Sequence, residues 1–261
     1  MALTRLFFGA AALSILITVG PAAAVRADDT TSGSAVPAGM TGAEKQRFDA
    51  LIRQYILDHP EVVIESLQAY QARQRAAAQQ ESRAALVALK DEIEKDPSAP
   101  VAGNAQGNVT IVEFFDYRCG YCKRVFPSIQ QLIETDGNIR YVFKEFPVLG
   151  PESVTAARAA LAVWNLQPDK YFPFHTALMQ ARGGLTEQRI LKIAEQVGLD
   201  PARVRDGMDD PRVEETLKKN AALAGQIKIN GTPAFVIDGQ LIPGAIDLAT
   251  IKQLVEAARQ S

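Results

Sequence analysis

Hydrophobic and polar positions divide the chain into extended and helical stretches whose order predicts an α/β fold. Residues 109–115 form an apolar, β-branched run that predicts a buried strand, and residues 139–146 predict a second strand. Between these runs, apolar residues recur at spacings of three and four after residue 122, which predicts a helix. This part of the chain is therefore expected to form a strand–helix–strand unit.

A helical block and a hairpin follow this unit. Residues 151–219 have an almost entirely helical spacing of apolar positions. Residues 234–237 and 240–242 flank Asp238-Gly239, a dipeptide that favours a tight β-hairpin turn. Residues 248–259 predict a final helix after this hairpin.

The order of these elements is that of a thioredoxin-type fold. A strand, a helix and a second strand are followed by the hairpin and the last helix, with the helical block inserted between the two halves. We therefore predict an α/β domain over residues 96–261 with a helical insertion at about residues 151–228.

Residues 41–95 predict helices that cannot form a core alone. One apolar face over residues 41–58 is followed by a second up to residue 70, and then by the polar, alanine-rich stretch 71–83, which reads as a spacer. The apolar segment must pack on the same chain or on other copies, and the pattern allows both. Packing between copies predicts an oligomerisation stalk through residues 41–70.

The first residues have the pattern of a secretory signal peptide. An apolar core over residues 6–19 is shorter than the roughly 20 residues that a membrane-spanning helix needs. Small residues then predict cleavage after Ala24 or Ala27, and we prefer Ala27. We expect residues 1–27 to be removed and residues 28–40, rich in Ser, Thr, Gly and Ala, to form a flexible mature N-terminus.

Export and charge limit the expected partners. Removing residues 1–27 takes Arg5 and Arg26 from the 28 basic residues and none from the 30 acidic residues, which leaves a net charge of −4. Such a chain has no basic field for nucleic acid. The signal predicts a periplasmic location, an oxidising compartment in which thiols can act on the disulfides of other proteins.

The two cysteines of the chain, Cys119 and Cys122, form a Cys-X-X-Cys motif between the first strand and the helix. A helix N-terminus offers free N–H groups and partial positive charge, which stabilise a thiolate. Cys119 is therefore the predicted nucleophile. Cys122 lies one turn further into the helix and is the predicted resolving thiol, which attacks the mixed disulfide formed by Cys119.

Other uses of the cysteine pair can be weighed from the sequence. Structural zinc needs about four ligands, but His59 and His175 stand alone in the sequence. Haem attachment needs a histidine directly after the second cysteine, where Lys123 stands. Two thiolates suffice for linear Cu(I), so Cys119 and Cys122 remain candidate copper ligands, although no Met or His cluster surrounds them. Lys123 and the preceding Arg118 are expected to be solvated.

Three motifs resemble the DsbA-like family of exported thiol–disulfide oxidoreductases. They are Glu113-Phe114-Phe115-Asp116-Tyr117 before the cysteines, Lys144-Glu145-Phe146-Pro147 after them, and Gly231-Thr232-Pro233-Ala234-Phe235 before the hairpin. The resemblance covers about residues 101–261. Residues 52–62 are similar to the suppressor of copper sensitivity protein C and its relatives. That similarity implies a trimer through this segment and disulfide isomerase activity.

The resemblance also implies roles for individual residues. Thr232 and Pro233 match a cis-proline loop that offers backbone groups to a substrate chain, next to Gly120 and Tyr121. Glu113 matches a buried acid beneath the resolving cysteine, whereas its local sequence also allows a solvent-facing edge position. Gly120-Tyr121 departs from the Pro-His pair of the strongly oxidising members. The thiolate therefore loses one stabilising charge, and the potential is expected between those members and thioredoxin.

Together these features predict a periplasmic protein disulfide oxidoreductase that uses no cofactor beyond its redox-active pair. The leading hypothesis is an isomerase or reductant of envelope proteins, trimeric through residues 41–70 and served by a membrane redox partner. One alternative is a monomeric dithiol oxidase that introduces disulfides. Another, from a different class, is a copper-tolerance protein that binds Cu(I) through Cys119 and Cys122.

Overall fold

The computed structural model describes residues 39–260. The predicted signal peptide and nearly all of the predicted flexible N-terminus lie outside the described residues. Contacts divide the chain after Ile64 into two compact units, which are described separately below. No helix within residues 39–260 is long and apolar enough to cross a membrane.

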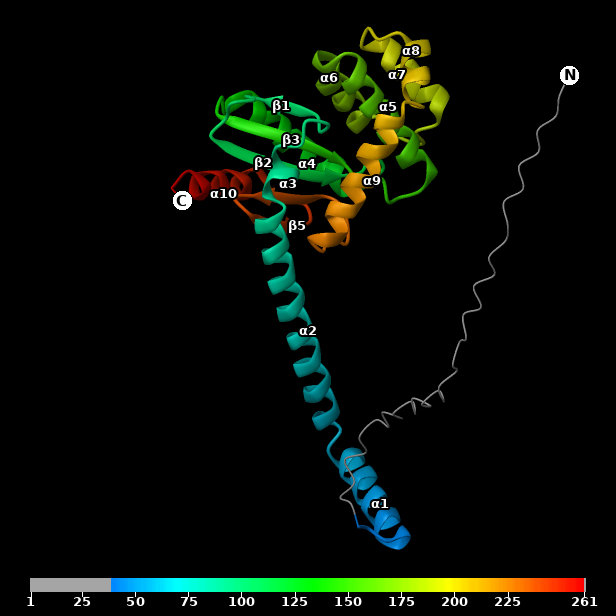
Figure 1. The fold of residues 1–261 in the computed structure, drawn as a ribbon, viewed down its shortest axis with the longest axis vertical. Coiled ribbons are helices and arrows are strands. Elements are labelled where there is room, and N and C mark those ends of the chain that lie inside the picture. The colour runs from blue at the N-terminus through cyan, green and yellow to red at the C-terminus, as the bar shows by residue number, and fades with distance from the viewer. Residues whose placement is uncertain (1–38, 261) are drawn as a thin grey trace, which may run out of the picture. The chain divides into compact units, whose positions relative to one another are not determined.

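The first unit contains helix α1 (Gly42–Asp58), labelled in Figure 1. Thr41 and Glu44 form a capping box at its start: the Thr41 N–H donates to the Glu44 carboxylate at 2.8 Å, and the Glu44 N–H donates to the Thr41 hydroxyl at 3.4 Å. No residue of α1 is buried, and the Leu51 side chain is 69% exposed. The apolar face predicted for this segment is therefore uncovered within the described part of the chain.

A five-stranded sheet forms the centre of the second unit, with strand order β1-β3-β2-β4-β5 (Figure 1). The strands are β1 (Val101–Gly103), β2 (Val109–Phe115), β3 (Ile139–Glu145), β4 (Ala234–Ile237) and β5 (Gln240–Pro243). β2 and β3 run parallel, and the other neighbours pair antiparallel. The sheet confirms the predicted thioredoxin-type fold, and β1 is a short additional strand that the sequence pattern did not indicate.

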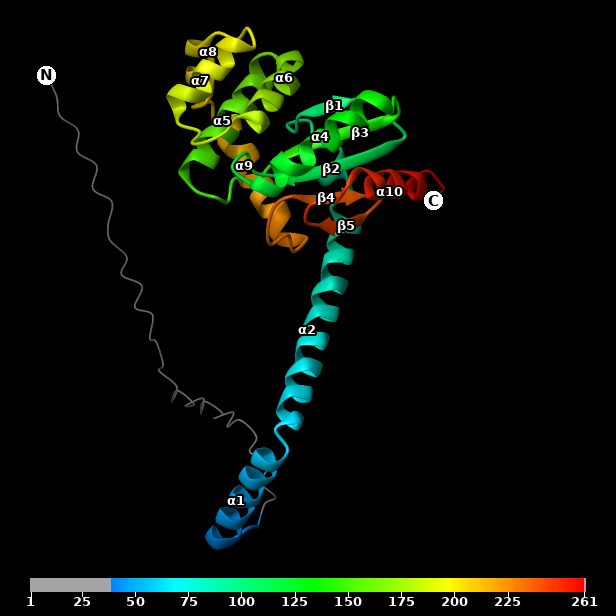
Figure 2. The same ribbon diagram turned by 180° about the vertical axis from the view of Figure 1, so that it is seen from behind.

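Helices cover both faces of this sheet (Figures 1 and 2). Helices α4 (Gly120–Thr135) and α10 (Leu248–Gln260) lie on one face. The other face carries the end of α2 (Glu61–Ala88), α3 (Lys90–Glu94) and the end of α9 (Pro211–Gln226). Helices α5 (Pro151–Leu166), α6 (Pro168–Gln180), α7 (Glu187–Gln196), α8 (Pro201–Gly207) and α9 separate β3 from β4 along the chain. The helical block is thus inserted between the two halves of the sheet.

Alternation along β2 decides which side chains approach the cysteine helix. Ile111 and Phe115 belong to the apolar cluster that includes α4, whereas Val112 and Phe114 belong to the cluster on the opposite face. Because side chains alternate, Glu113 points to the α4 face between Ile111 and Phe115. β2 has neighbours on both sides, so Glu113 is buried in the sheet and does not lie on an edge.

The second half of α2 is attached to the sheet domain. The Ser82 hydroxyl donates to the Ile227 carbonyl at 2.8 Å, and Leu86 is buried in the same apolar cluster as Ile227 and Val236. The expectation that residues 71–83 act purely as a spacer is therefore wrong at Ser82. The alanine-rich sequence gave no sign of this contact because its partner lies 145 positions away in the sequence.

A buried ion pair ties the segment between α3 and β1 to strand β3. Lys144 on β3 donates to the Asp96 carboxylate at 2.6 Å, and both side chains are almost fully buried. Burial alone would raise the pKa of Asp96, but hydrogen bonds from Lys144 and Ser98 outweigh it and lower that pKa to about 2. The Lys219 ammonium adds a second contact to Asp96 at 3.3 Å.

Replacing Lys144 by methionine should destabilise the protein by about 3 kcal/mol at pH 7, because it leaves the Asp96 charge buried beside a single remaining cation. Since the native pKa of Asp96 is depressed, the contribution is complete above its unfolded pKa of about 4 and is lost as the pH falls towards 2. Urea unfolding at pH 7 and at pH 3 measures this loss.

Lys95→Met is the matched control, because Lys95 pairs with Asp91 on the surface. Its unfolding midpoint should equal that of the wild type. Equal stability of Lys144→Met and the wild type at pH 7 would show that the buried pair does not hold the segment in place.

Candidate redox site

Cys119 is the N-cap residue of α4. Its backbone is extended, and its sulfur accepts a hydrogen bond from the Cys122 N–H at 3.5 Å. The Cys119 N–H in turn donates to the Asp116 carbonyl at 3.0 Å, which closes the turn between β2 and the helix. Both cysteines are free, so the structure is that of the reduced protein. The sulfur lies where the unpaired N–H groups of the helix point.

The environment of Cys119 favours the thiolate and lowers its pKa to about 5. The largest cause is a hydrogen bond from the Cys122 side chain, which stabilises the charged form. Burial raises the pKa of Cys119, since the residue is only 6% exposed. Further hydrogen bonds from the Thr232 side chain and from the Cys122 and Tyr121 backbones lower this pKa again. Cys119 is therefore ionised at neutral pH.

The Thr232–Pro233 peptide bond is cis, and it places the Thr232 carbonyl against the nucleophile. The Cys119 thiol donates to this carbonyl over 3.2 Å. Only the protonated sulfur can make this bond, so ionisation frees the carbonyl oxygen. The loop that sequence similarity matched to a substrate platform is thus in direct contact with Cys119, although 113 positions separate the two residues.

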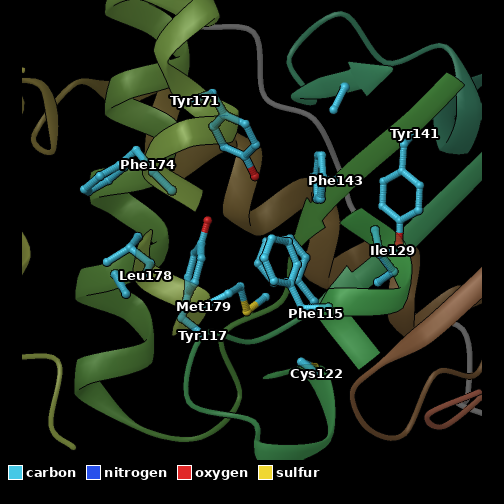
Figure 3. Packing of buried hydrophobic residues seen from close by; sticks show 14 of the residues in the cluster. Phe115, Tyr117, Cys122, Ile129, Tyr141, Phe143, Tyr171, Phe174, Leu178 and Met179 are labelled. Carbon is cyan, nitrogen blue, oxygen red and sulfur yellow. The ribbon is translucent and has the colours of Figure 1, made fainter. Parts of the chain in front are cut away.

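Cys122 has the opposite environment. Its side chain is fully buried, and it belongs to the same apolar cluster as Phe115 and Tyr141 (Figure 3). The hydrogen bond to Cys119, burial and the nearby Glu113 carboxylate all raise the pKa of Cys122 above its usual range. Cys122 therefore keeps its proton while Cys119 is ionised. This difference separates the nucleophilic thiolate from the resolving thiol.

Glu113 lies beneath this pair, on the α4 face of β2. Burial raises its pKa to about 8; a hydrogen bond from the Tyr141 hydroxyl at 2.8 Å opposes this rise, and the Cys119 charge adds to it. Its second carboxylate oxygen has no hydrogen-bond partner among residues 39–260. A buried carboxyl with a pKa of about 8 can take up and release a proton near neutral pH.

Tyr121 lies on the outer side of the motif and is 58% exposed. It lines a groove of about 470 Å³ together with Thr232 and Pro233, so the structure brings these three predicted substrate residues together. The Arg124 guanidinium lies 4.9 Å from the centre of the Tyr121 ring. Gly120 is different, because a side chain there would meet no atom within 4 Å, and nothing in the reduced structure requires a glycine.

Asp116 is a site residue that the sequence analysis missed. One of its carboxylate oxygens accepts the Arg118 N–H at 2.7 Å, and the other accepts the N–H groups of Val148 and Leu149 at 2.9 and 3.0 Å. It thereby joins the cysteine turn to the loop after β3. An aspartate two residues before Arg118 is typical of an Asx turn, but no sequence signal identifies the contact with the second loop.

Tyr141 was missed as well. The solvation expected for Lys123 is wrong because its side chain is partly buried, whereas Arg118 is exposed as expected. The Lys123 ammonium donates to the carbonyls of Leu178 and Ala181 at 3.1 and 2.6 Å and so joins α4 to the end of α6. The Arg118 side chain pairs with Glu152 at 3.2 Å. Both cations therefore connect the cysteine turn to the helical insertion.

His175 is buried among aromatic rings, donates to or accepts from the Tyr117 hydroxyl at 2.9 Å, and has a pKa lowered to about 3 by burial. His59 lies at the end of α1 in the first unit. Within residues 39–260, no group of three or more His, Cys, Asp or Glu residues could hold a metal ion.

A thiolate at a helix N-terminus, a protonated partner one turn later and a cis-proline loop beside them define a thiol–disulfide oxidoreductase of the thioredoxin fold. The profile of the DSBA-like thioredoxin domain family matches residues 110–256, more than half of the chain, so the chain belongs to this family. The copper resistance protein ScsC N-terminal domain matches residues 44–77. Both findings confirm the resemblance expected from the motifs.

Solved structures agree with this assignment. A thioredoxin-like oxidoreductase from Silicibacter pomeroyi DSS-3 is 43% identical, with a TM-score of 0.63, over 66% of this chain and 98% of that one. A linker-deletion mutant of Proteus mirabilis ScsC is 26% identical, with a TM-score of 0.65, over 86% and 99%. A periplasmic thioredoxin-like protein from Salmonella enterica serovar Typhimurium is 31% identical, with a TM-score of 0.62, over 66% and 97%.

The first curated relatives are much longer than the part that matches. The Na(+)/H(+) antiporter NhaA 1 of Salinispora arenicola is 29% identical over 160 residues, which are 60% of this chain and 24% of the antiporter. The chain thus spans about a quarter of that relative. A likeness of this extent carries no transport function to this chain.

Reaction of the reduced protein with iodoacetamide should reach half of its maximal rate near pH 5, because only the thiolate reacts and the pKa of Cys119 is about 5. The same ionisation stabilises the reduced form. Because the native pKa is depressed from 9.0, this stabilisation is complete above pH 9 and is lost as the pH falls through 5. Mass spectrometry of the labelled cysteine measures the rate.

Cys119→Ser serves as the control, since it leaves only the buried, protonated Cys122 and should hardly react across this range. A midpoint near pH 8.5 for the wild type, the value of an ordinary cysteine, would contradict the stabilised thiolate.

Proposed function

We propose that the protein is a disulfide isomerase and reductant of envelope proteins in the periplasm. The observation that carries this proposal is the opposite shift of the two cysteine pKa values, lowered to about 5 for Cys119 and raised for Cys122. A stabilised thiolate beside a protonated partner is the form that attacks an existing disulfide. A pKa of about 5 also lies between about 7 for thioredoxin and about 3.5 for the oxidant DsbA.

The reaction proceeds by two exchanges. The Cys119 thiolate attacks one sulfur of a substrate disulfide, forms a mixed disulfide and releases the other substrate sulfur as a thiolate. In isomerisation, that released thiolate or another substrate thiol attacks the mixed disulfide and frees Cys119 again. In reduction, Cys122 attacks Cys119, the Cys119–Cys122 disulfide forms, and the second substrate thiolate leaves with the electron pair.

Glu113 is the proposed proton acceptor for Cys122 in the reductive branch. The Cys119 charge is one of the causes that raise the pKa of Glu113. Formation of the mixed disulfide consumes this charge, so the pKa of Glu113 falls and the carboxylate form becomes more populated. The carboxylate then takes the Cys122 proton at the stage when Cys122 must become a nucleophile.

Trimerisation through residues 41–70 is the second part of the proposal. Apolar side chains along this segment are exposed: Leu51, Ile52, Tyr55, Leu57, Ile64, Leu67 and Tyr70. None of the residues of α1 is buried. A partner is therefore needed to cover the apolar face of this helix. The match to the ScsC N-terminal domain supports the same assembly. Several catalytic units on one stalk hold a misfolded substrate at several points, which favours isomerisation.

Location and electron supply complete the proposal. The periplasmic assignment rests on the signal peptide expected in residues 1–27 and on similarity to a periplasmic relative. An isomerase must be kept reduced in this oxidising compartment, so a membrane partner that donates electrons to the Cys119–Cys122 disulfide is required. The dithiol oxidase and the Cu(I)-binding protein are the alternatives that the experiments below distinguish.

Replacing Tyr141 by phenylalanine should slow the resolving step at pH 7 by about fivefold and move its pH profile up by about one unit. The Tyr141 hydrogen bond favours the Glu113 carboxylate, so its loss raises the pKa of Glu113 further above 8. Stopped-flow decay of a preformed mixed disulfide between Cys119 and glutathione measures the step.

Tyr171→Phe is the matched control, because its buried hydroxyl bonds to Glu145 and not to Glu113. It should keep the wild-type pH profile, whereas Glu113→Gln should lose the pH dependence attributed to the carboxyl. A wild-type profile for Tyr141→Phe would show that Glu113 does not control the resolving step.

The double substitution Ile52→Glu and Leu67→Glu should convert a trimer of the mature protein into monomers, because it places charges within the exposed apolar face. Light scattering measures the mass. Refolding of a scrambled disulfide protein should fall at least about tenfold through the lost avidity. Reduction of glutathione disulfide, which needs only one Cys119–Cys122 pair, should be unchanged.

Arg53→Glu, at an exposed polar position of the same helix, should remain trimeric and active. A monomeric wild-type protein would refute the stalk. If the protein oxidised a reduced peptide efficiently but failed to refold the scrambled substrate, the dithiol oxidase would replace the isomerase. Tight Cu(I) binding that Cys119→Ser abolishes, without either activity, would favour the copper-binding alternative.

A further inference from the structure

A second hollow lies next to the groove beside Tyr121 and Pro233. This hollow, here called the α2 channel, has a volume of about 990 Å³ and lies between the second half of α2, β5 and residues 228–230. It shares Lys228, Asn230, Leu241 and Pro243 with the groove at the cysteines. The two hollows therefore adjoin each other, and the α2 channel lies next to the groove that Pro233 lines.

The α2 wall of this channel is held in place. Ser82 and Leu86 line the channel, and the same two residues anchor α2 to the second unit, through the 2.8 Å bond to the Ile227 carbonyl and through apolar packing. The opposite wall is the hairpin strand β5, at the edge of the sheet. Both walls therefore belong to the same compact unit as Cys119.

The charges in the channel have one sign. Its lining contains Arg75, Arg83 and Lys228 and no acidic residue. Lys228 pairs with Glu81 at 3.1 Å, and Arg75 makes a long contact of 3.5 Å with Gln71. The Arg83 residue is exposed, and its guanidinium has no hydrogen bond or ion pair to any residue of the described chain. The channel is thus a local basic surface with an unpaired guanidinium in a protein whose net charge is −2.

The shape of the channel suits an extended chain. Within residues 39–260, β5 has a neighbour, β4, on one side only, so its outer edge leaves backbone groups free to bind an extended peptide. Leu241 on β5 and Val87 on α2, which is 78% exposed, give the channel an apolar component beside its arginines. An extended segment complements the free edge of β5, and acidic side chains on that segment complement the arginines of the channel.

We propose that the α2 channel binds an extended acidic segment of the protein substrate, adjacent in sequence to the cysteine that Cys119 attacks. The proposal rests on the proposed function, because the segment enters the channel from the reacting disulfide. It gives α2 a second role beyond the stalk. Arg83 selects among substrates by charge, while Cys119 and Cys122 carry out the exchange.

The test uses the mature protein and peptides that carry one cysteine in a mixed disulfide with glutathione. Four peptides have a tail of six residues, either Asp and Glu or Asn and Gln, placed before or after the cysteine. The second-order rate constant of peptide release by reduced protein is measured at low salt and at about 0.5 M salt, with glutathione disulfide as a small probe.

We expect the wild type to release one of the acidic peptides about fivefold faster than its neutral counterpart at low salt, and to lose this preference at high salt. Arg83→Glu should abolish the preference. Arg73→Glu, an equal charge change at an exposed α2 position outside the channel, should retain it. Glutathione disulfide should be reduced at the same rate by all three proteins.

Two results overturn the proposal in different ways. A wild type that reduces every probe without a charge preference, or equal losses in Arg83→Glu and Arg73→Glu, would remove the α2 channel and leave the proposed function standing. A wild type that reduces neither the peptides nor glutathione disulfide would overturn the proposed function, and the channel with it.

Discussion

The hydrogen bonds at the N-terminus of α4 are the interaction on which this site depends. They stabilise the Cys119 thiolate only if the helix end and the turn after β2 keep their mutual positions. Asp116 fixes the turn against the loop after β3, and Lys123 fixes the helix against α6. The sheet and the inserted helices thus together fix the position of the Cys119 sulfur at the end of α4.

The same support makes the two cysteines unequal. Cys119 gains hydrogen bonds that favour a charge, whereas Cys122 is enclosed by apolar side chains and faces the Glu113 carboxyl. The order of chemical events follows from this difference, because the charge on Cys119 also sets the proton affinity of Glu113. In the reaction that we propose, attack by Cys119 removes that charge and lowers the pKa of Glu113 before Cys122 must lose its proton.

Local sequence patterns predicted most helices and strands, but they could not predict contacts between elements that lie far apart in the sequence. The apolar run of β2 and the helical spacing after Cys122 placed the motif correctly because these signals arise within one element. β1 has three residues, too few for a periodic pattern, and its position depends on pairing with β3. Likewise, the Tyr141 bond to Glu113 and the Ser82 bond to Ile227 join residues far apart in the sequence.

The reduction potential of the Cys119–Cys122 pair tests the central claim most directly, because it reports how strongly the protein stabilises the reduced thiolate. Equilibration with glutathione at pH 7, followed by mass spectrometry of the alkylated cysteines, gives the value. A pKa of about 5 predicts a potential between about −270 mV, as in thioredoxin, and about −120 mV, as in the oxidant DsbA. A potential at either extreme would contradict this account of the site.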